Sequence, residues 1–408
     1  MIREFRKIWK LYAIGILWLF GLIWPLKGIK PDGSLEFQEA FRIWLFLLVP
    51  VTLGVAYYVL KQSGTLNPVA SPLAGVRERI GALLHRLPRW SWMTAFLAPV
   101  VVFPFVTSRY HQDVAIFVMI YICLGLGLNI VVGLAGMLDL GYIAFYGIGA
   151  YTYALLSVHY GISYWLCLPV AALFAMIGGC VIGYPTLRMR GDYLAIVTLG
   201  FGEIVRIVLN NWMSLTNGPN GILRIKPPDM LVPVFADGFG FEHIYLKKLH
   251  LLYFVALLLV LFTMVAVYRL NHSRIGRAWE SIREDETAAE LMGVNTFTLK
   301  LLAYAMGAFF GGLAGAFFAA RMRFVNPESF TFLESAMVLS MVVLGGMASI
   351  PGIVLGAAAL IVLPEVFREF ESYRMAVFGA AMTFMMVFKP AGLIPARRMG
   401  RGSKAKGG

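Results

Sequence analysis

The sequence carries little charge for its length. Only 14% of its 408 residues are Asp, Glu, Lys or Arg, whereas an average soluble domain has about 25%. Hydrophobic residues make up 59% of the chain. A water-soluble protein of this composition would expose large apolar patches and aggregate. The composition therefore excludes a soluble globular protein.

The sequence also lacks the short motifs of several enzyme classes. It contains no G-x-x-x-x-G-K-[ST] segment, so it has no phosphate-binding P-loop of its own. H-E-x-x-H, G-x-S-x-G and paired-cysteine motifs are absent as well. The three cysteines, Cys123, Cys167 and Cys180, lie inside apolar runs without metal-ligand spacing. We therefore expect a chain that is not an enzyme, binds no cofactor or metal and has no disulfide framework.

Long apolar runs are the dominant feature that is present. They are about 16 to 25 residues long, which is the length of a helix that crosses a bilayer core. The runs occupy residues 11–26, 41–60, 92–107, 113–132, 137–158, 163–184, 193–212, 250–268, 301–320, 335–348, 350–365 and 374–389. Glycines and a proline interrupt 335–365, so this stretch forms one span or two short ones. The sequence predicts an all-α, polytopic membrane helix bundle of ten to twelve spans with broken or re-entrant helices.

The basic residues predict the orientation of the chain. The formal net charge is +13, and no nucleic-acid-binding motif accompanies it, so we expect no nucleic-acid partner. With twelve spans and the N-terminus inside, 22 of the 35 Lys and Arg residues fall on the inner side. Cytoplasmic loops of membrane proteins carry such an excess. Both termini are therefore predicted to be cytoplasmic.

One charged segment between apolar runs, residues 269–300, has its own helix signals. Asp285 is suited to cap a short helix over 286–292, and Gly293 is suited to end it. A short capped helix can serve as a rigid projection for a partner to bind. From the residues alone, the segment is either a solvated loop with ordinary ion pairs or a docking element for a soluble partner.

A few polar residues within the apolar runs are candidates for a translocation path or for a half-helix cap. Asp139 lies in the glycine-rich stretch 133–154, where a broken helix is plausible for a transporter; alternatively, Asp139 is an N-cap at the cytoplasmic interface. Glu203 and Arg206 share a helix face, so they form either a functional site or a self-satisfied pair. Asn129 is the third candidate, after Asp139 and Glu203.

Glycines recur at four-residue spacing in the run 301–320, at Gly307, Gly311 and Gly315. Small residues at this spacing form a face along which two membrane helices approach closely. We expect this face to serve helix packing, within the chain or against a second membrane subunit.

Several separate motifs resemble one family of membrane proteins. They are LGLNIVVGLAGMLDLGYIAFYGIGAY (126–151), YPTLRMRGDYLAIVTLGFGEIVR (184–206), TNGPNGI (216–222), GRAWESIREDETAAELMGVN (276–295), VLGGMASIPGIVLGAAAL (343–360) and KPAGLIP (389–395). Together they are similar to the LivM-type permeases, which are membrane subunits of bacterial high-affinity ABC importers for branched-chain amino acids. The resemblance covers about residues 94–396.

The resemblance implies a subunit of a larger machine. Such permeases work with a second homologous permease subunit, two cytoplasmic P-loop ATPases that use ATP, and a periplasmic binding protein that delivers Leu, Ile or Val. The implied location is the bacterial inner membrane, and the implied mechanism is alternating access. The outer insertion 213–249 would then belong to the surface that receives the binding protein.

The same resemblance implies a coupling role for the charged segment. The residues assigned to ATPase coupling are Arg283, Glu284, Asp285, Glu286, Ala288, Ala289, Glu290 and Gly293. Importers often carry E-A-A followed by a glycine at fixed spacing, and here Thr287 replaces the first Glu. A role tied to that carboxylate would then fall to Glu286 or Glu290.

The sequence predicts four regions along the chain. Residues 1–60 form an N-terminal extension with two spans, and 61–91 form a basic cytoplasmic linker. Residues 92–396 form the permease core, and 397–408 form a basic cytoplasmic tail.

Two transporter classes remain as alternatives to a branched-chain amino acid permease. One is the permease of a related importer for urea or short amides, which shares much of the motif pattern. The other is a secondary transporter driven by an ion gradient, which would need coupling carboxylates at mid-membrane, where the sequence offers Asp139 and Glu203.

Overall fold

The computed structural model describes residues 100–366 except 188, 190, 235–239 and 247, together with residues 379 and 392–395. All of these residues belong to one compact unit of the chain, Pro99–Gly408. The spans predicted at 11–26, 41–60 and 374–389, the linker 61–91 and the tail 397–408 lie outside the described residues.

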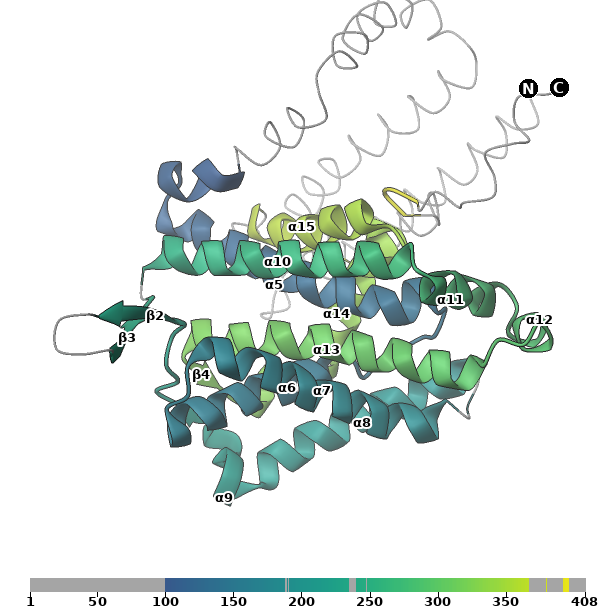
Figure 1. The fold of residues 1–408 in the computed structure, drawn as a ribbon, viewed down its shortest axis with the longest axis horizontal. Coiled ribbons are helices and arrows are strands. Elements are labelled where there is room, and N and C mark those ends of the chain that lie inside the picture. Colours follow the sequence, from purple (N-terminus) through teal and green to yellow (C-terminus); the bar gives the residue numbers. More distant parts are fainter. Residues whose placement is uncertain are drawn as a thin grey trace, which may run out of the picture. The chain divides into compact units, whose positions relative to one another are not determined.

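Helix α13, Thr296–Met322, is the centre of the described bundle and is 27 residues long. Four helices pack around it: α5 (Arg109–Asn129), α6 (Ile143–Leu155), α7 (Tyr164–Thr186) and α10 (Leu249–Asn271). Figure 1 shows these helices running roughly along one direction, with α8 (Asp192–Asn211) beside them. The buried core is the apolar contact region between them.

Glycines allow α13 to approach its neighbours closely. A Cβ atom at Gly307 would meet the Val131 side chain and the Gly127 carbonyl of α5. A Cβ atom at Gly315 would overlap the Tyr146 carbonyl of α6. The three-glycine face predicted on this helix therefore packs within the chain, against α5 and α6 and the turn before α6.

Six helical stretches of the described residues are long and apolar enough to cross a membrane. They are Arg109–Leu134, Tyr164–Thr186, Tyr193–Asn211, Leu249–Asn271, Thr296–Met322 and Pro327–Gly345. The apolar helix α15, Ile350–Val366, is shorter. A polytopic helix bundle is therefore confirmed in the described part of the chain, whereas the total of ten to twelve spans stays a prediction.

The stretch 335–365 is broken into two helices. Helix α14 covers Phe332–Gly345, and α15 begins at Ile350. Between them, Gly346 and Ala348 have positive φ angles of 115° and 66°, which a continuous helix cannot contain.

The prediction of one span over 137–158 is wrong at its beginning. Helix α5 ends in a π-helical turn, η1 (Ile130–Leu134), and residues 135–142 are not helical. Helix α6 begins only at Ile143 and continues as the π-helical turn η2, Leu156–Tyr160. The chain turns at Gly136, whose φ angle of 74° suits glycine and disfavours other residues.

The insertion 213–249 forms short strands and helical turns beside the helix bundle. The insertion contains α9 (Met213–Thr216), η3 (Gly218–Asn220), β1 (Ile222–Leu223), β2 (Asp229–Val234) and β3 (Gly240–Tyr245). Strands β2 and β3 pair antiparallel, and β1 pairs with β4 (Phe324–Val325), which follows α13. These ladders satisfy backbone groups that have no helix to join.

The bundle has two distinct ends, named here after elements in Figure 1. The α12 end carries the short helices α11 (Arg274–Glu284) and α12 (Glu286–Leu291). The β4 end carries β1, β4 and the 3-10 turn η4 (Pro327–Ser329), which leads into α14.

Candidate functional site

The charged segment after α10 folds against the start of α13. Ser273 caps α11 by accepting a hydrogen bond from the Gly276 N–H at 3.2 Å. Trp279 is fully buried, and its indole N–H donates to the Leu299 carbonyl of α13 at 2.7 Å. Helix α11 is thus fixed to the bundle on its apolar side.

Helix α12 is the short capped helix that the sequence predicts. The Asp285 carboxylate accepts a hydrogen bond from the Ala288 N–H at 3.0 Å, and α12 then covers Glu286–Leu291. Gly293, with a φ angle of 84°, follows its end. The Lys300 ammonium lies 2.5 Å from the Glu286 carboxylate, which joins α12 to α13.

The tip of α12 presents an apolar surface beside acidic residues. Leu291 and Met292 are 83% and 84% exposed, whereas Ala289 is buried on the opposite side. Glu284, Asp285 and Glu290 are exposed as well. Large apolar side chains that remain open on a rigid helix form a surface suited to a protein partner.

Loss of the α12 cap is expected to loosen this tip without unfolding the bundle. Replacing Asp285 by alanine removes the acceptor for the Ala288 N–H, and such a loss costs about 0.5–2 kcal/mol of helix stability. Hydrogen exchange should become faster over Glu286–Leu291 and stay unchanged in α13. Asp285→Ser, which keeps a capping oxygen, serves as the control; equal protection in the alanine variant would contradict the cap.

Arg283 connects the charged segment to the end of α5. Its guanidinium donates a hydrogen bond to the Gly133 carbonyl, which lies at the end of the π-helical turn η1. A Cβ atom at Gly136 would lie 2.7 Å from the Arg283 Cγ. The Arg283 side chain therefore lies directly on the turn between α5 and α6.

Asn129 connects this turn to the second helix break. Its Oδ1 atom accepts a hydrogen bond from the Ala348 N–H at 2.8 Å, in the connection between α14 and α15. A side chain on Gly133 would collide with both groups. Because Arg283 binds the Gly133 carbonyl, the charged segment and the two helix breaks form one continuous set of contacts.

Asp139 lies buried inside the turn before α6. Its Oδ1 atom accepts a hydrogen bond from the Gly141 N–H at 2.8 Å, and only 1% of the residue is exposed. The first N–H group of α6, at Ile143, instead donates to the Ser335 hydroxyl of α14 at 3.1 Å. Asp139 thus binds the turn, and the first N–H group of α6 is bound by Ser335 instead; a place for Asp139 on a translocation path stays a prediction.

Glu203 and Arg206 form the ion pair that their spacing predicts, with 2.8 Å between Nε and Oε2. The sequence did not single out two further carboxylates, Glu328 and Glu334. Glu328 lies 3.6 Å from the Arg206 guanidinium, and Glu334, in the first turn of α14, accepts a hydrogen bond from the Tyr121 hydroxyl at 2.5 Å. Glu334 directly precedes the apolar run 335–348, which was an available signal, whereas Glu328 lies farther from that run.

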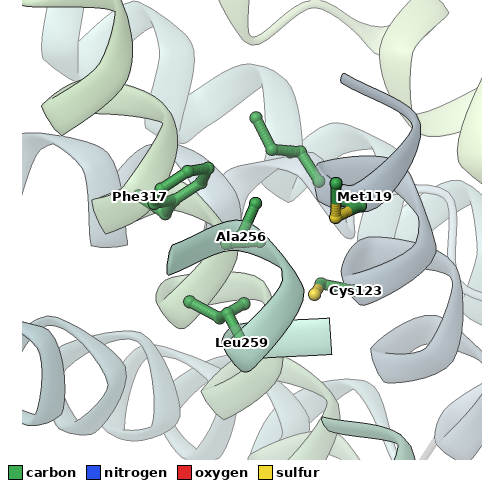
Figure 2. A pocket seen from close by; sticks show the side chains of 7 residues that line it. Met119, Cys123, Ala256, Leu259 and Phe317 are labelled. Carbon is green, nitrogen blue, oxygen red and sulfur yellow. The ribbon is translucent and has the colours of Figure 1, made fainter. Parts of the chain in front are cut away.

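A small apolar pocket lies between α5, α10 and α13 (Figure 2). Met119, Cys123, Ala256, Leu259 and Phe317 are among its lining residues. No charged side chain lines it, so it offers no partner for the charged groups of an amino acid.

We compared the chain with known protein families. Residues 110–387 match the family model described as branched-chain amino acid transport system / permease component. This range contains both helix breaks, the charged segment and the Glu203–Arg206 pair.

Curated relatives carry the same description. The chain is 48% identical over 319 residues to the high-affinity branched-chain amino acid transport system permease protein LivM of Escherichia coli K12, with 75% of each chain covered. It is 25% identical over 245 residues to a probable LivM permease of Methanocaldococcus jannaschii, covering 56% of this chain and 68% of the relative. It is also 25% identical over 289 residues to the permease LivH of Salmonella typhimurium, covering 67% and 91%. No solved structure matches the chain.

Proposed function

The chain belongs to the family of permease components of branched-chain amino acid transport systems, and from this membership we propose how the subunit works. It is a permease subunit of a high-affinity branched-chain amino acid ABC transport system and is not itself an enzyme. In the proposed transporter it pairs with a second, homologous permease, and two cytoplasmic P-loop ATPases and a periplasmic binding protein complete the complex. The similarity to a LivH permease supports the paired subunit.

The proposed substrates are leucine, isoleucine and valine, delivered by the binding protein. The names of the relatives support this choice over urea or short amides. The ATP-driven mechanism replaces the ion-coupled alternative, because relatives and family model alike describe components of a transport system. The complex lies in the bacterial inner membrane, with the α12 end and both termini on the cytoplasmic side.

The observation that carries the coupling proposal is the rigid, exposed tip of α12. Leu291 and Met292 project from a helix that Asp285 caps and that Lys300 ties to α13. We assign this tip to the groove of an ATPase subunit. The residues that we assign to ATPase coupling, Arg283 to Glu286, Ala288 to Glu290 and Gly293, lie in and around it.

The contacts that join α11 and α12 to the two helix breaks support the proposed alternating access. When the ATPases close on ATP, α11 and α12 move together, because the Asp285 N–H donates to the Ser281 carbonyl of α11 and the Asp285 carboxylate caps α12. Arg283 carries this movement to the turn at Gly133–Gly136, and Asn129 carries it to the connection at Ala348. The helices on either side of the two breaks then open the path first outward and then inward.

A bulky residue at Gly293 is expected to abolish uptake while membrane insertion stays intact. Apart from its two chain neighbours, no atom of the described residues lies within 4 Å of a Cβ placed at Gly293, so the bulk of a Trp side chain there projects into the open space in which we place the ATPase. Gly293→Ala is the matched control, since it imposes the same strain at positive φ without the bulk. Glu284→Arg is likewise expected to abolish uptake, and Glu280→Arg, also exposed on α11, is its control.

The assembly itself is tested by purification from the native membrane in mild detergent. Two P-loop ATPases and a second permease are expected to copurify, and reconstituted vesicles should take up leucine but not urea. The coupling assignment would be contradicted if the chain purified without partners under several mild conditions. Normal uptake by Gly293→Trp would contradict it as well.

A further inference from the structure

Three charged side chains meet where η4 packs on α8: Glu203 and Arg206 of α8 and Glu328 of η4, named here the charged cluster. The Arg206 Nε–H donates to Glu203 at 2.8 Å, and its Nη1 atom lies 3.6 Å from the Glu328 carboxylate of η4. Two carboxylates share one guanidinium, so the charges of the cluster are not matched one to one.

The charged cluster is open to its surroundings within a membrane span. The side chains of Arg206 and Glu203 are 28% and 31% exposed, and that of Glu328 is 67% exposed. The span Tyr193–Asn211 that carries the first two is the least buried of the six, with 22% of its apolar window buried. Hydrocarbon does not solvate such groups, so this side of α8 borders water or another polar surface.

A second ion pair of the described bundle shows how a structural pair is shielded instead. Arg321, at the end of α13, lies 2.6 Å from Asp113; the Arg321 side chain is only 9% exposed, whereas that of Asp113 is 47% exposed. The Phe117 ring also covers its guanidinium at 4.4 Å. Arg206 has no comparable cover among the described residues.

The chemistry of the charged cluster matches the two ends of an amino acid. A guanidinium binds a carboxylate through several N–H groups in one plane, and a carboxylate binds an ammonium through charge-assisted hydrogen bonds. Ile207, next to Arg206, is 51% exposed and offers an apolar contact for a branched side chain. We propose that the charged cluster lines the translocation path and binds the α-carboxylate and α-ammonium groups of the amino acid in transit.

The place of the charged cluster fits the direction of import. This inference rests on the proposed function, in which the binding protein delivers substrate at the β4 end. Turn η4, which carries Glu328, packs against η3 of the insertion 213–249 at that end. An amino acid released there meets Glu328 first and the Glu203–Arg206 pair next.

Cysteine labelling in the assembled transporter tests whether water reaches the charged cluster. Glu203→Cys and Glu328→Cys, made in a Cys180→Ser background, are treated with a charged methanethiosulfonate reagent. We expect both to react at least ten times faster than Leu258→Cys, an exposed apolar position in the middle of α10. Failure of both to react would overturn the inference, because the cluster would then face the partner permease or lipid.

Uptake separates a role in binding from a role in structure. Arg206→Gln and Glu328→Gln are expected to lower leucine uptake at least tenfold, while the complex still assembles and the loaded binding protein still stimulates ATP hydrolysis. Normal uptake by both variants would overturn the inference. So would recovery of uptake by the exchanged pair Glu203→Arg with Arg206→Glu, because only a structural pair tolerates exchange. If Arg206→Gln fails to assemble while Glu328→Gln transports normally, the cluster joins subunits and the inference is wrong.

Failure of the proposed function would look different. In that case the wild-type complex itself would take up no leucine, whereas failure of this inference leaves wild-type uptake intact.

Discussion

Replacement of Arg283 by alanine is expected to lower leucine uptake at least tenfold while the transporter stays assembled. The side chain donates to the Gly133 carbonyl and lies against the Gly136 backbone. A hydrogen bond from a charged group contributes about 1.5–3 kcal/mol, which corresponds to a tenfold or larger change in an equilibrium between two conformations. Without this bond, the movement of α11 would no longer be passed on fully to the turn before α6.

The readout for Arg283→Ala is the number of ATP molecules hydrolysed per leucine imported. This ratio should rise, because the ATPases still close but the permease no longer follows. A purely structural defect would lower assembly and ATP hydrolysis together and leave the ratio unchanged. Arg277→Ala, an exposed arginine on the same helix, is the matched control and should keep the ratio of the wild type. A wild-type ratio in Arg283→Ala would exclude its role in transmission.

Replacement of Gly315 by alanine is expected to destabilise the bundle strongly. The new methyl group would overlap the Tyr146 carbonyl and crowd the Ala150 backbone of α6. Backbone does not give way as a flexible side chain does, so α13 and α6 would have to move apart. Overpacking of a well-packed core costs about 1–3 kcal/mol, and here the strain falls on one of the largest contacts of the described bundle.

The matched control is the same substitution at Gly200 in α8. A Cβ atom there meets no other atom within 4 Å, and alanine is favoured over glycine in a helix by roughly 1 kcal/mol. Thermal unfolding in detergent should therefore show a lower midpoint for Gly315→Ala and an equal or higher midpoint for Gly200→Ala. Equal midpoints for the two variants would contradict the close packing of α13 on α6.

The side chains that bind the two helix breaks bind backbone groups. Arg283 binds a backbone carbonyl, Asn129 binds a backbone N–H, and Ser335 binds the first N–H of α6. These bonds reach atoms that no motif marks, because every residue has a carbonyl and almost every residue has an N–H. Asn129 and Ser335 are uncharged, so of these three contacts only that of Arg283 brings a charge to the helix breaks.

The sequence by itself determined the class of the protein, most of the helices in the described residues and the short capped helix α12. Composition and run length dictate membrane helices because hydrocarbon tolerates only apolar side chains and satisfied backbone groups. The cap of α12 at Asp285 and the pair of Glu203 with Arg206 were predictable as well, since both are interactions between residues three apart on one helix.

The tertiary structure alone decided what depends on residues far apart in the chain. The break at 135–142 replaces the first part of an apparently continuous span, because Gly136 turns against Arg283 and the Asp139 carboxylate binds the turn. The Asp139 carboxylate consequently binds the N–H of Gly141 within this turn, and Ser335 binds the first N–H of α6. Glu328 joins Arg206 only because η4 folds back onto α8. Spacing along the sequence records contacts within one helix, whereas these contacts arise from the packing of different helices, which local sequence patterns do not encode.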